Sequence, residues 1–195
     1  AGECACVSVH GANRLGGNSL LETIVFGRRA GVRAGEYVRT VVPQALRNDQ
    51  LTTEQTRVQR LLAQEGSVRA WQLREELGQT MSLNLGLVRT QESMSAALSA
   101  ISALTQRAAS LTVQDKGQVF NTDLVQALEL ECLLDVAETI VTSALARQES
   151  RGAHYRSDYP VRNDRQWLKH SLIRRTPGGT ALTHEPVTVT RFPPA

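Results

Sequence analysis

Apolar residues recur every three to four positions through the central part of the chain, a spacing that predicts amphipathic helices. Three helices are expected, at about residues 67–88, 94–108 and 121–151, with Ser67 capping the first and a left-handed Gly152 closing the last. The third carries two apolar rows, which suits a helix with neighbours on two sides. Because the links between the helices are short, antiparallel packing into a three-helix bundle is predicted.

A separate amphipathic helix is predicted near the start of the chain, from about Ser19 through Tyr37, with Asn18 or Ser19 as its N-cap. Upstream, small and apolar residues alternate over positions 1–10, as they do in a short strand. A lone strand and one amphipathic helix cannot bury their apolar faces by themselves. This part of the chain is therefore expected to be disordered or to pack against a neighbouring copy.

The last part of the chain has the two-residue periodicity of strands. Apolar residues alternate over positions 168–173 and return at 180–182, and the turn sequence Pro177-Gly-Gly179 lies between them. This pattern predicts a β hairpin. Val187 and Val189 offer a third strand.

A polar stretch at residues 47–53 reads as a linker and places a boundary near residue 50. The predicted parts are residues 1–50, a helical bundle over 51–153, and a docking loop with a hairpin tail over 154–195. The fold class is mainly α: a three-helix bundle followed by a small β hairpin. It is preceded by a strand and a helix.

Composition supports a helical core, because aromatic residues make up only 4% of the chain and the apolar positions are filled by Leu, Val, Ile and Ala. The net charge of +3 is mild, and no run of Lys or Arg is clustered with aromatic residues. Both observations argue against a nucleic-acid-binding protein. No apolar stretch approaches the ~20 residues that cross a bilayer, so membrane contact would have to come through a partner.

The three cysteines lack the paired spacing of a disulfide framework, and a reducing cytosol is the simpler environment for them. Cys4, Cys6 and His10 could suggest a metal site. The usual Cys-x-x-Cys spacing is absent, however, so no metal is expected. Cys132 falls within the longest helical pattern and is expected in the core.

The most distinctive stretch of the chain runs from Gly11 to Leu20. Its glycines at positions 11, 16 and 17 allow a tight turn, and the N–H groups of the following helix would point into that turn. Together with the guanidinium of Arg14, such a helix start favours a negatively charged group. By themselves the residues leave two interpretations open: an anion site, or an ordinary helix start with Arg14 on the surface.

Several long motifs of this chain, found in the same order, resemble the flavoprotein subunit of succinate dehydrogenase and fumarate reductase. They lie at residues 1–22, 120–124, 149–160 and 167–170. Because these motifs cover nearly the whole chain, the resemblance is specific, and it favours the anion site over the ordinary helix start.

The resemblance implies roles for four residues. The family's glutamate that contacts FAD matches Glu3, and its contacts at the flavin end of FAD match Ser19 and Leu20 at the helix start. Arg14 matches the family's substrate-binding arginine, which holds one carboxylate of succinate or fumarate beside the flavin, and it is assigned to the cofactor site as well. No catalytic residue or metal ligand is expected within the chain, and His10 receives no catalytic role.

In such a flavoprotein, hydride passes between the dicarboxylate and FAD, and electrons leave through an iron–sulfur subunit. Membrane-anchor subunits would hold the complex at the cytoplasmic face of the inner membrane. This chain has no Gly-x-Gly-x-x-Gly segment after a strand, so the dinucleotide-binding part is missing. The resemblance therefore implies that the strand and helix of residues 1–50 are a truncated piece, the C-terminal remnant, of an FAD-binding α/β domain. We therefore expect a C-terminal fragment that is inactive alone and does not bind FAD by itself.

Two rival functions and one local ambiguity stay open. L-aspartate oxidase shares the Asn-Arg-Leu-x-x-Asn-Ser-Leu and Glu-Ser-Arg-Gly patterns, but it usually has Ala-Ser where this chain has Gly16 and Gly17. The helical residues 54–150 could instead be a non-catalytic interaction module. The polar residues 151–165 are either a solvated loop of mixed charge or a segment that docks on the flavin domain. His154 among them has no sequence neighbour that would make it an acid or a base.

Overall fold

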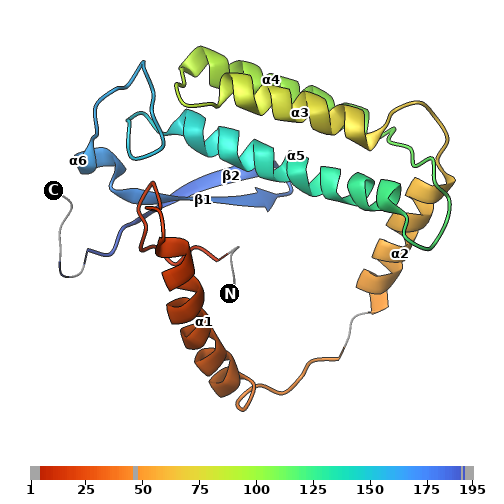
Figure 1. The fold of residues 1–195 in the computed structure, drawn as a ribbon, viewed down its shortest axis with the longest axis horizontal. Coiled ribbons are helices and arrows are strands. Elements are labelled where there is room, and N and C mark those ends of the chain that lie inside the picture. The colour runs from red at the N-terminus through yellow and green to blue at the C-terminus, as the bar shows by residue number, and fades with distance from the viewer. Residues whose placement is uncertain (1–4, 46–47, 190, 192–195) are drawn as a thin grey trace. The chain divides into compact units, whose positions relative to one another are not determined.

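The computed structural model describes residues 5–45, 48–189 and 191. The chain divides into two compact units, Ala1–Asn48 and Asp49–Ala195. The elements of the described residues, labelled in Figure 1, are α1 (Asn18–Tyr37), α2 (Asn48–Ala63), α3 (Ala70–Asn84), α4 (Gln91–Ala108), α5 (Thr122–Ala146), α6 (Asp164–Trp167), β1 (Lys169–Thr176) and β2 (Gly179–Pro186).

The first unit contains the helix α1, and none of its residues is buried. Leu20, Ile24 and Val32 expose more than half of their surface, so the predicted helix forms while its apolar side chains stay in contact with solvent. The predicted strand is wrong: described residues 5–10 are irregular, and Ser8 has a φ of 58°. Alternation produces a strand only where a partner strand pairs with it, and nothing in the described residues pairs with this segment.

The second unit is built on a bundle of α3, α4 and α5, in which each helix contacts the other two. Figure 1 shows α3 and α4 side by side, with α5 running along both. Its described core consists of aliphatic and methionine side chains without an aromatic ring, as the composition predicts. The helical fold class and the three-helix bundle are confirmed.

Side-chain caps set the starts of α4 and α5. Thr90 and Ser93 form a reciprocal capping box at α4, and the Asn121 side chain accepts a hydrogen bond from the Leu124 amide at 2.8 Å. Two predicted ends are wrong. Helix α3 begins after Arg69 and not at Ser67, and α5 ends at Ala146, well before Gly152.

Gly152 does adopt a left-handed conformation, with φ 56°, but it belongs to a separate tight turn. In that turn the amides of Arg151 and His154 each donate to the other residue's carbonyl oxygen. The helix stops earlier because the chain turns extended at Arg147, with ψ 109°. The prediction of a left-handed Gly152 is therefore confirmed, but this residue lies in a separate turn and does not end α5.

Helix α2 was not predicted, and residues 48–53 of the expected linker are its first turns. Its apolar residues are sparse, and Leu61 near its end is its buried residue. The expectation that Cys132 lies in the core is also wrong, since this residue is exposed. The side of α5 that faces the bundle carries Leu130 and Leu134, so Cys132 points away from it.

Strands β1 and β2 form the predicted antiparallel hairpin, with Thr176 opposite Gly179 at the turn. Gly179 has a φ of 110°, a conformation that side-chain-bearing residues rarely adopt. The described residues contain no third strand, so that prediction for Val187 and Val189 is wrong. The Val187 amide instead donates a single bond to the Leu168 carbonyl oxygen at 3.4 Å.

The hairpin is tied to α5 by side chains. Arg175 forms an ion pair with Asp135, and the Thr180 hydroxyl donates to Glu138 at 2.5 Å. Among residues 5–45 and 48–189, no helix combines the length and the apolar content needed to cross a bilayer.

Candidate functional site

The glycine turn before α1 owes its shape to two of its three glycines. Gly11 and Gly17 have φ values of 61° and 81°, which glycine tolerates best, whereas a Cβ at Gly16 would meet open space. Gly17 is the N-cap of α1, and no side chain caps the helix. The predicted capping role of Asn18 and Ser19 is therefore wrong, because the left-handed Gly17 turns the chain into the helix before either residue can act.

The first turn of α1 holds two of the residues assigned to FAD. Ser19 is half-buried and Leu20 is largely exposed. The Leu20 amide donates to the Gly17 carbonyl oxygen at 3.2 Å, and the Asn18 amide donates to Leu15 at 3.3 Å, so these two donors have local partners. Glu3, the remaining FAD assignment from the first residues, lies outside the described residues.

Arg14 lies next to an acidic residue to which the sequence gave no role. Its Nη1 is 3.7 Å from Oε2 of Glu22, and the same oxygen is 2.7 Å from Nε2 of His10. The Arg14 side chain is 44% exposed, whereas that of Glu22 is only 19% exposed. One carboxylate thus connects two residues of the glycine turn to α1.

The signal that could have revealed Glu22 is its position just past the first turn of α1. An acidic side chain there complements the positive end of the helix dipole and lies within reach of the residues that precede the helix. Arg14 precedes the helix by only a few residues, so the sequence places Glu22 near it along the chain, but the contact itself depends on how the turn folds back on α1.

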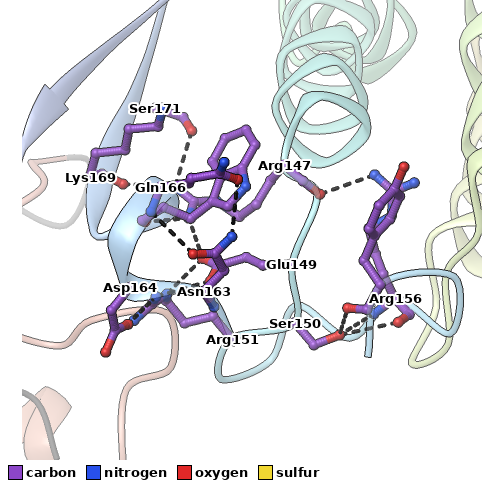
Figure 2. A network of polar contacts seen from close by, with 12 residues as sticks. Arg147, Glu149, Ser150, Arg151, Arg156, Asn163, Asp164, Gln166, Lys169 and Ser171 are labelled. Carbon is purple, nitrogen blue, oxygen red and sulfur yellow. Dashed lines mark hydrogen bonds and ion pairs between the residues drawn. The ribbon is translucent and has the colours of Figure 1, made fainter. Parts of the chain in front are cut away.

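The second unit holds a dense polar network between the end of α5 and β1 (Figure 2). At its centre, the Glu149 side chain is completely buried. It accepts hydrogen bonds from Arg147 at 2.6 Å, from Arg151 at 2.7 Å and from the Asn163 amide at 2.8 Å. Arg151 also pairs with Asp164, which lies at the start of α6.

These donors decide the charge of Glu149. Burial by itself would raise the pKa of the carboxyl group, but hydrogen bonds from Arg151, the Asn163 amide and Arg147 outweigh it and hold the pKa below its usual value. Glu149 is therefore ionised at neutral pH, with two cations beside it.

Arg156 is a second buried centre, with no exposed surface. Its Nη1 donates to the carbonyl oxygens of Leu145 at 2.9 Å and Arg147 at 3.0 Å, which belong to the unsatisfied carbonyls at the end of α5. Its Nε and Nη2 donate to the Asp158 carboxylate. The backbone N–H of Gln91, at the start of α4, donates to the same carboxylate at 2.8 Å. A cation thus meets the negative end of α5 and an anion the positive end of α4.

The hydrogen bond from Arg156 lowers the pKa of Asp158 to about 2. Three groups hold residues 151–165 in place: the Arg156–Asp158 pair, Glu149 and the backbone of Arg89. The Arg89 amide donates to Tyr155 and its carbonyl accepts from Ser157. The interpretation as a solvated loop is therefore wrong for the buried residues of this segment. Its docking on a flavin domain stays a prediction.

His154 stands in a cationic environment. Arg89 Nη1 donates to its Nδ1 at 3.0 Å, so the ring must be neutral there and carry its proton on Nε2. Nε2 is buried and makes no hydrogen bond of ordinary geometry within the described part of the chain. Burial and the charges of Arg89, Arg147 and Arg156 lower the pKa of His154, which a backbone contact with Arg147 offsets only in part.

The lowered pKa of His154 makes the stability of the second unit sensitive to mild acid. The unfolded histidine takes up a proton near pH 6.5 while the folded one resists it, so the contribution is complete above about pH 6.5 and is lost as the pH falls. We expect His154→Asn, whose amide oxygen can still accept from Arg89, to weaken the fall in melting temperature between neutral pH and pH 5. An NMR titration in which His154 has a pKa above 6.5 would contradict this.

Comparison with known proteins identifies the class of protein to which this fold belongs. The bundle, its polar segment and the hairpin correspond to the C-terminal part of a flavoprotein: the family model described as "Fumarate reductase flavoprotein C-term" matches residues 74–195. The chain belongs to the family of succinate dehydrogenase and fumarate reductase flavoprotein subunits.

Individual relatives agree with this assignment. The succinate dehydrogenase flavoprotein subunit of Rickettsia conorii is 42% identical over 97% of this chain, which covers 32% of that protein. A solved E. coli quinol fumarate reductase FrdA is 40% identical, with a TM-score of 0.94, over the whole chain and 34% of its own. The Mycobacterium smegmatis Sdh1 complex is 32% identical, with a TM-score of 0.82, over 92% of this chain and 31% of its own. The chain therefore spans about a third of the length of its relatives.

Proposed function

We propose that this chain is the C-terminal third of a flavoprotein subunit that interconverts succinate and fumarate. The support is the family match over residues 74–195 together with relatives that are named succinate dehydrogenase or fumarate reductase and are about three times as long. In the complete subunit FAD supplies the acceptor or donor of hydride. The potentials of the flavin and of its electron partner set the direction of the reaction.

Arg14 binds one carboxylate of the dicarboxylate. The observation that carries this role is its placement: it lies in the glycine turn beside an uncapped helix start, with almost half of its side chain exposed. Its ion pair with Glu22 is long, at 3.7 Å, so most of its N–H donors remain available to a ligand. A planar guanidinium that binds a carboxylate through two parallel hydrogen bonds fixes the orientation of the substrate.

The residues present fit the edge of a flavin in two respects. No side chain caps α1, so the positive end of its dipole is open to a group that gathers negative charge. The Ser19 side chain, at the same helix start, is a hydroxyl that can donate or accept. Ser19 and Leu20 would hold the flavin end of FAD and Glu3 another part of it, and the rest of the FAD site would come from the remainder of the subunit.

The complete subunit works with partners in this proposal. Electrons leave through an iron–sulfur subunit, and membrane-anchor subunits keep the complex at the cytoplasmic face of the membrane. The support comes from the solved relatives, which are described as a quinol fumarate reductase and an Sdh1 complex.

Replacing Arg14 by Gln in the full-length subunit tests the proposal. Loss of charge-assisted hydrogen bonds worth about 3 kcal/mol lowers kcat/KM for succinate and fumarate about 100-fold. Steady-state kinetics of the assembled complex measures this, with flavin content as the check on folding. The matched control is Arg33→Gln, which removes a surface cation of α1 that pairs with Glu36 and leaves turnover unchanged.

Unimpaired turnover of both dicarboxylates in Arg14→Gln would refute the proposed role. Oxidation of L-aspartate by the full-length subunit, without a partner, would replace the proposal by the aspartate oxidase alternative.

A further inference from the structure

Glu22 connects the glycine turn to α1 through a single oxygen. Oε2 lies 2.7 Å from His10 Nε2 and 3.7 Å from Arg14 Nη1. His10 and Glu22 are both mostly buried, with side chains 22% and 19% exposed, whereas Arg14 is 44% exposed. His10 and Glu22 therefore form a largely buried pair, and Arg14 lies next to this pair with more of its side chain in solvent.

We propose that Glu22 is a positioning residue that holds the Arg14 guanidinium in the orientation in which it receives a substrate carboxylate. This inference rests on the proposed function of Arg14. His10 fixes the Glu22 carboxylate by hydrogen bonding, and the carboxylate attracts one corner of the guanidinium. The N–H groups of Arg14 stay available for the ligand, because a guanidinium has five donors and its contact with Glu22, 3.7 Å at Nη1, is too long for a hydrogen bond.

Two effects of the Glu22 charge oppose each other. The carboxylate competes with the substrate for Arg14, which weakens binding. It also restricts the rotamers of a long side chain before the ligand arrives, so less conformational entropy is lost on binding. The competition is small, because the pair makes no hydrogen bond at 3.7 Å and the substrate can bind the guanidinium without displacing Glu22. Restriction of the arginine dominates, and removal of the charge weakens substrate binding.

Glutamine is the informative replacement at position 22. Its amide oxygen can accept the hydrogen bond from His10, so the turn and the start of α1 keep their contact. It has no charge with which to attract Arg14. We expect Glu22→Gln in the full-length subunit to raise KM for succinate and fumarate about three- to fivefold, the range that an exposed ion pair allows, while kcat, flavin content and melting temperature stay near their original values.

The matched control is Glu36→Gln, which removes a carboxylate from the same helix. Glu36 pairs with Arg33 at 2.8 Å, is 57% exposed and lies far along α1 from the glycine turn. We expect Glu36→Gln to leave KM unchanged. A KM effect at Glu22 but not at Glu36 separates a local role from a general change in the charge of the helix.

A double-mutant cycle with Arg14→Gln shows whether Glu22 acts through Arg14. If it does, adding Glu22→Gln to Arg14→Gln changes kcat/KM no further. An unchanged KM in Glu22→Gln, an additive loss in the double variant, or a loss of flavin in Glu22→Gln would each overturn the inference. If Arg14→Gln itself left turnover intact, the proposed function would fail, and that result is distinct from the other three.

Discussion

Replacing Arg156 by methionine lowers the free energy of unfolding of this chain by about 3–5 kcal/mol, the range found when one partner of a buried ion pair is removed. Methionine approximates the volume of the side chain, so the loss comes from hydrogen bonds and charge. The carbonyl oxygens of Leu145 and Arg147 lose their donor, and Asp158 loses its counter-ion. The end of α5 and the start of α4 lose their shared support.

Urea unfolding followed by tryptophan fluorescence measures this effect. Both tryptophans, Trp71 in α3 and Trp167 in α6, belong to the second unit, so the signal does not depend on α1. The control is Arg175→Met, which breaks a pair with Asp135 that is exposed on both sides and costs no more than about 1 kcal/mol. Equal losses of unfolding free energy in the two variants would show that the burial of Arg156 does not increase its contribution to stability.

Replacing Glu149 by glutamine costs about 3 kcal/mol, because it leaves Arg147 and Arg151 without the charge that compensates their burial. The variant retains the shape of the side chain, so packing is preserved. The control is Glu129→Gln, at an ion pair with Arg74 in which both side chains are more than half exposed. Its effect stays within about 1 kcal/mol. The same urea unfolding curves report both variants, and a loss at Glu149 no larger than that at Glu129 would contradict the prediction.

The acid dependence of stability provides a second readout for Glu149. Its folded-state pKa is lowered, so its contribution is complete above the pKa of an unfolded glutamate, about 4.3, and disappears as the pH falls through the folded-state value. The wild-type chain therefore loses more stability below pH 4 than Glu149→Gln does. Asp158, whose pKa is lowered to about 2, acts in the same direction and remains in both proteins.

Periodicity predicted the parts of the fold that follow from local sequence. Helices α3, α4 and α5 have apolar residues at helical spacing, and their buried positions, such as Leu73, Met94 and Leu130, fall on the predicted faces. The hairpin followed from alternation and the turn that ends at Gly179. Helix α2 was missed because its stability depends on a few contacts near Leu61 and not on a continuous apolar stripe.

The network contains pairs that are close in sequence, such as Arg156 with Asp158, but the contacts that tie it to the start of α4 join distant residues and could not be read from the sequence. Arg156 reaches Gln91, and His154 reaches Arg89, across separations of 65 residues. Nothing in the local composition distinguishes a buried arginine from a solvated one. Burial of Glu149 depends in the same way on the path of the chain through Asn163. Only the assembled bundle brings these groups together.

In the glycine turn, one functional residue could be predicted from the sequence and its neighbour could not. Its importance and that of Arg14 could be recognised from the sequence and from the resemblance. The neighbour of Arg14, Glu22, was within the same motif and went unassigned, because a single acidic residue on a helix is usually a surface residue. Its contact with His10 becomes visible only when the turn is folded back on α1.

The long separation between the segment around Arg156 and its contacts at the start of α4 has a kinetic consequence. Contacts between residues 65 apart require a large loop to close, so we expect them to form late in folding. Interactions absent from the folding transition state affect the rate of unfolding more than the rate of folding. We therefore expect substitutions that break these contacts to raise the rate of unfolding more than they lower the rate of folding.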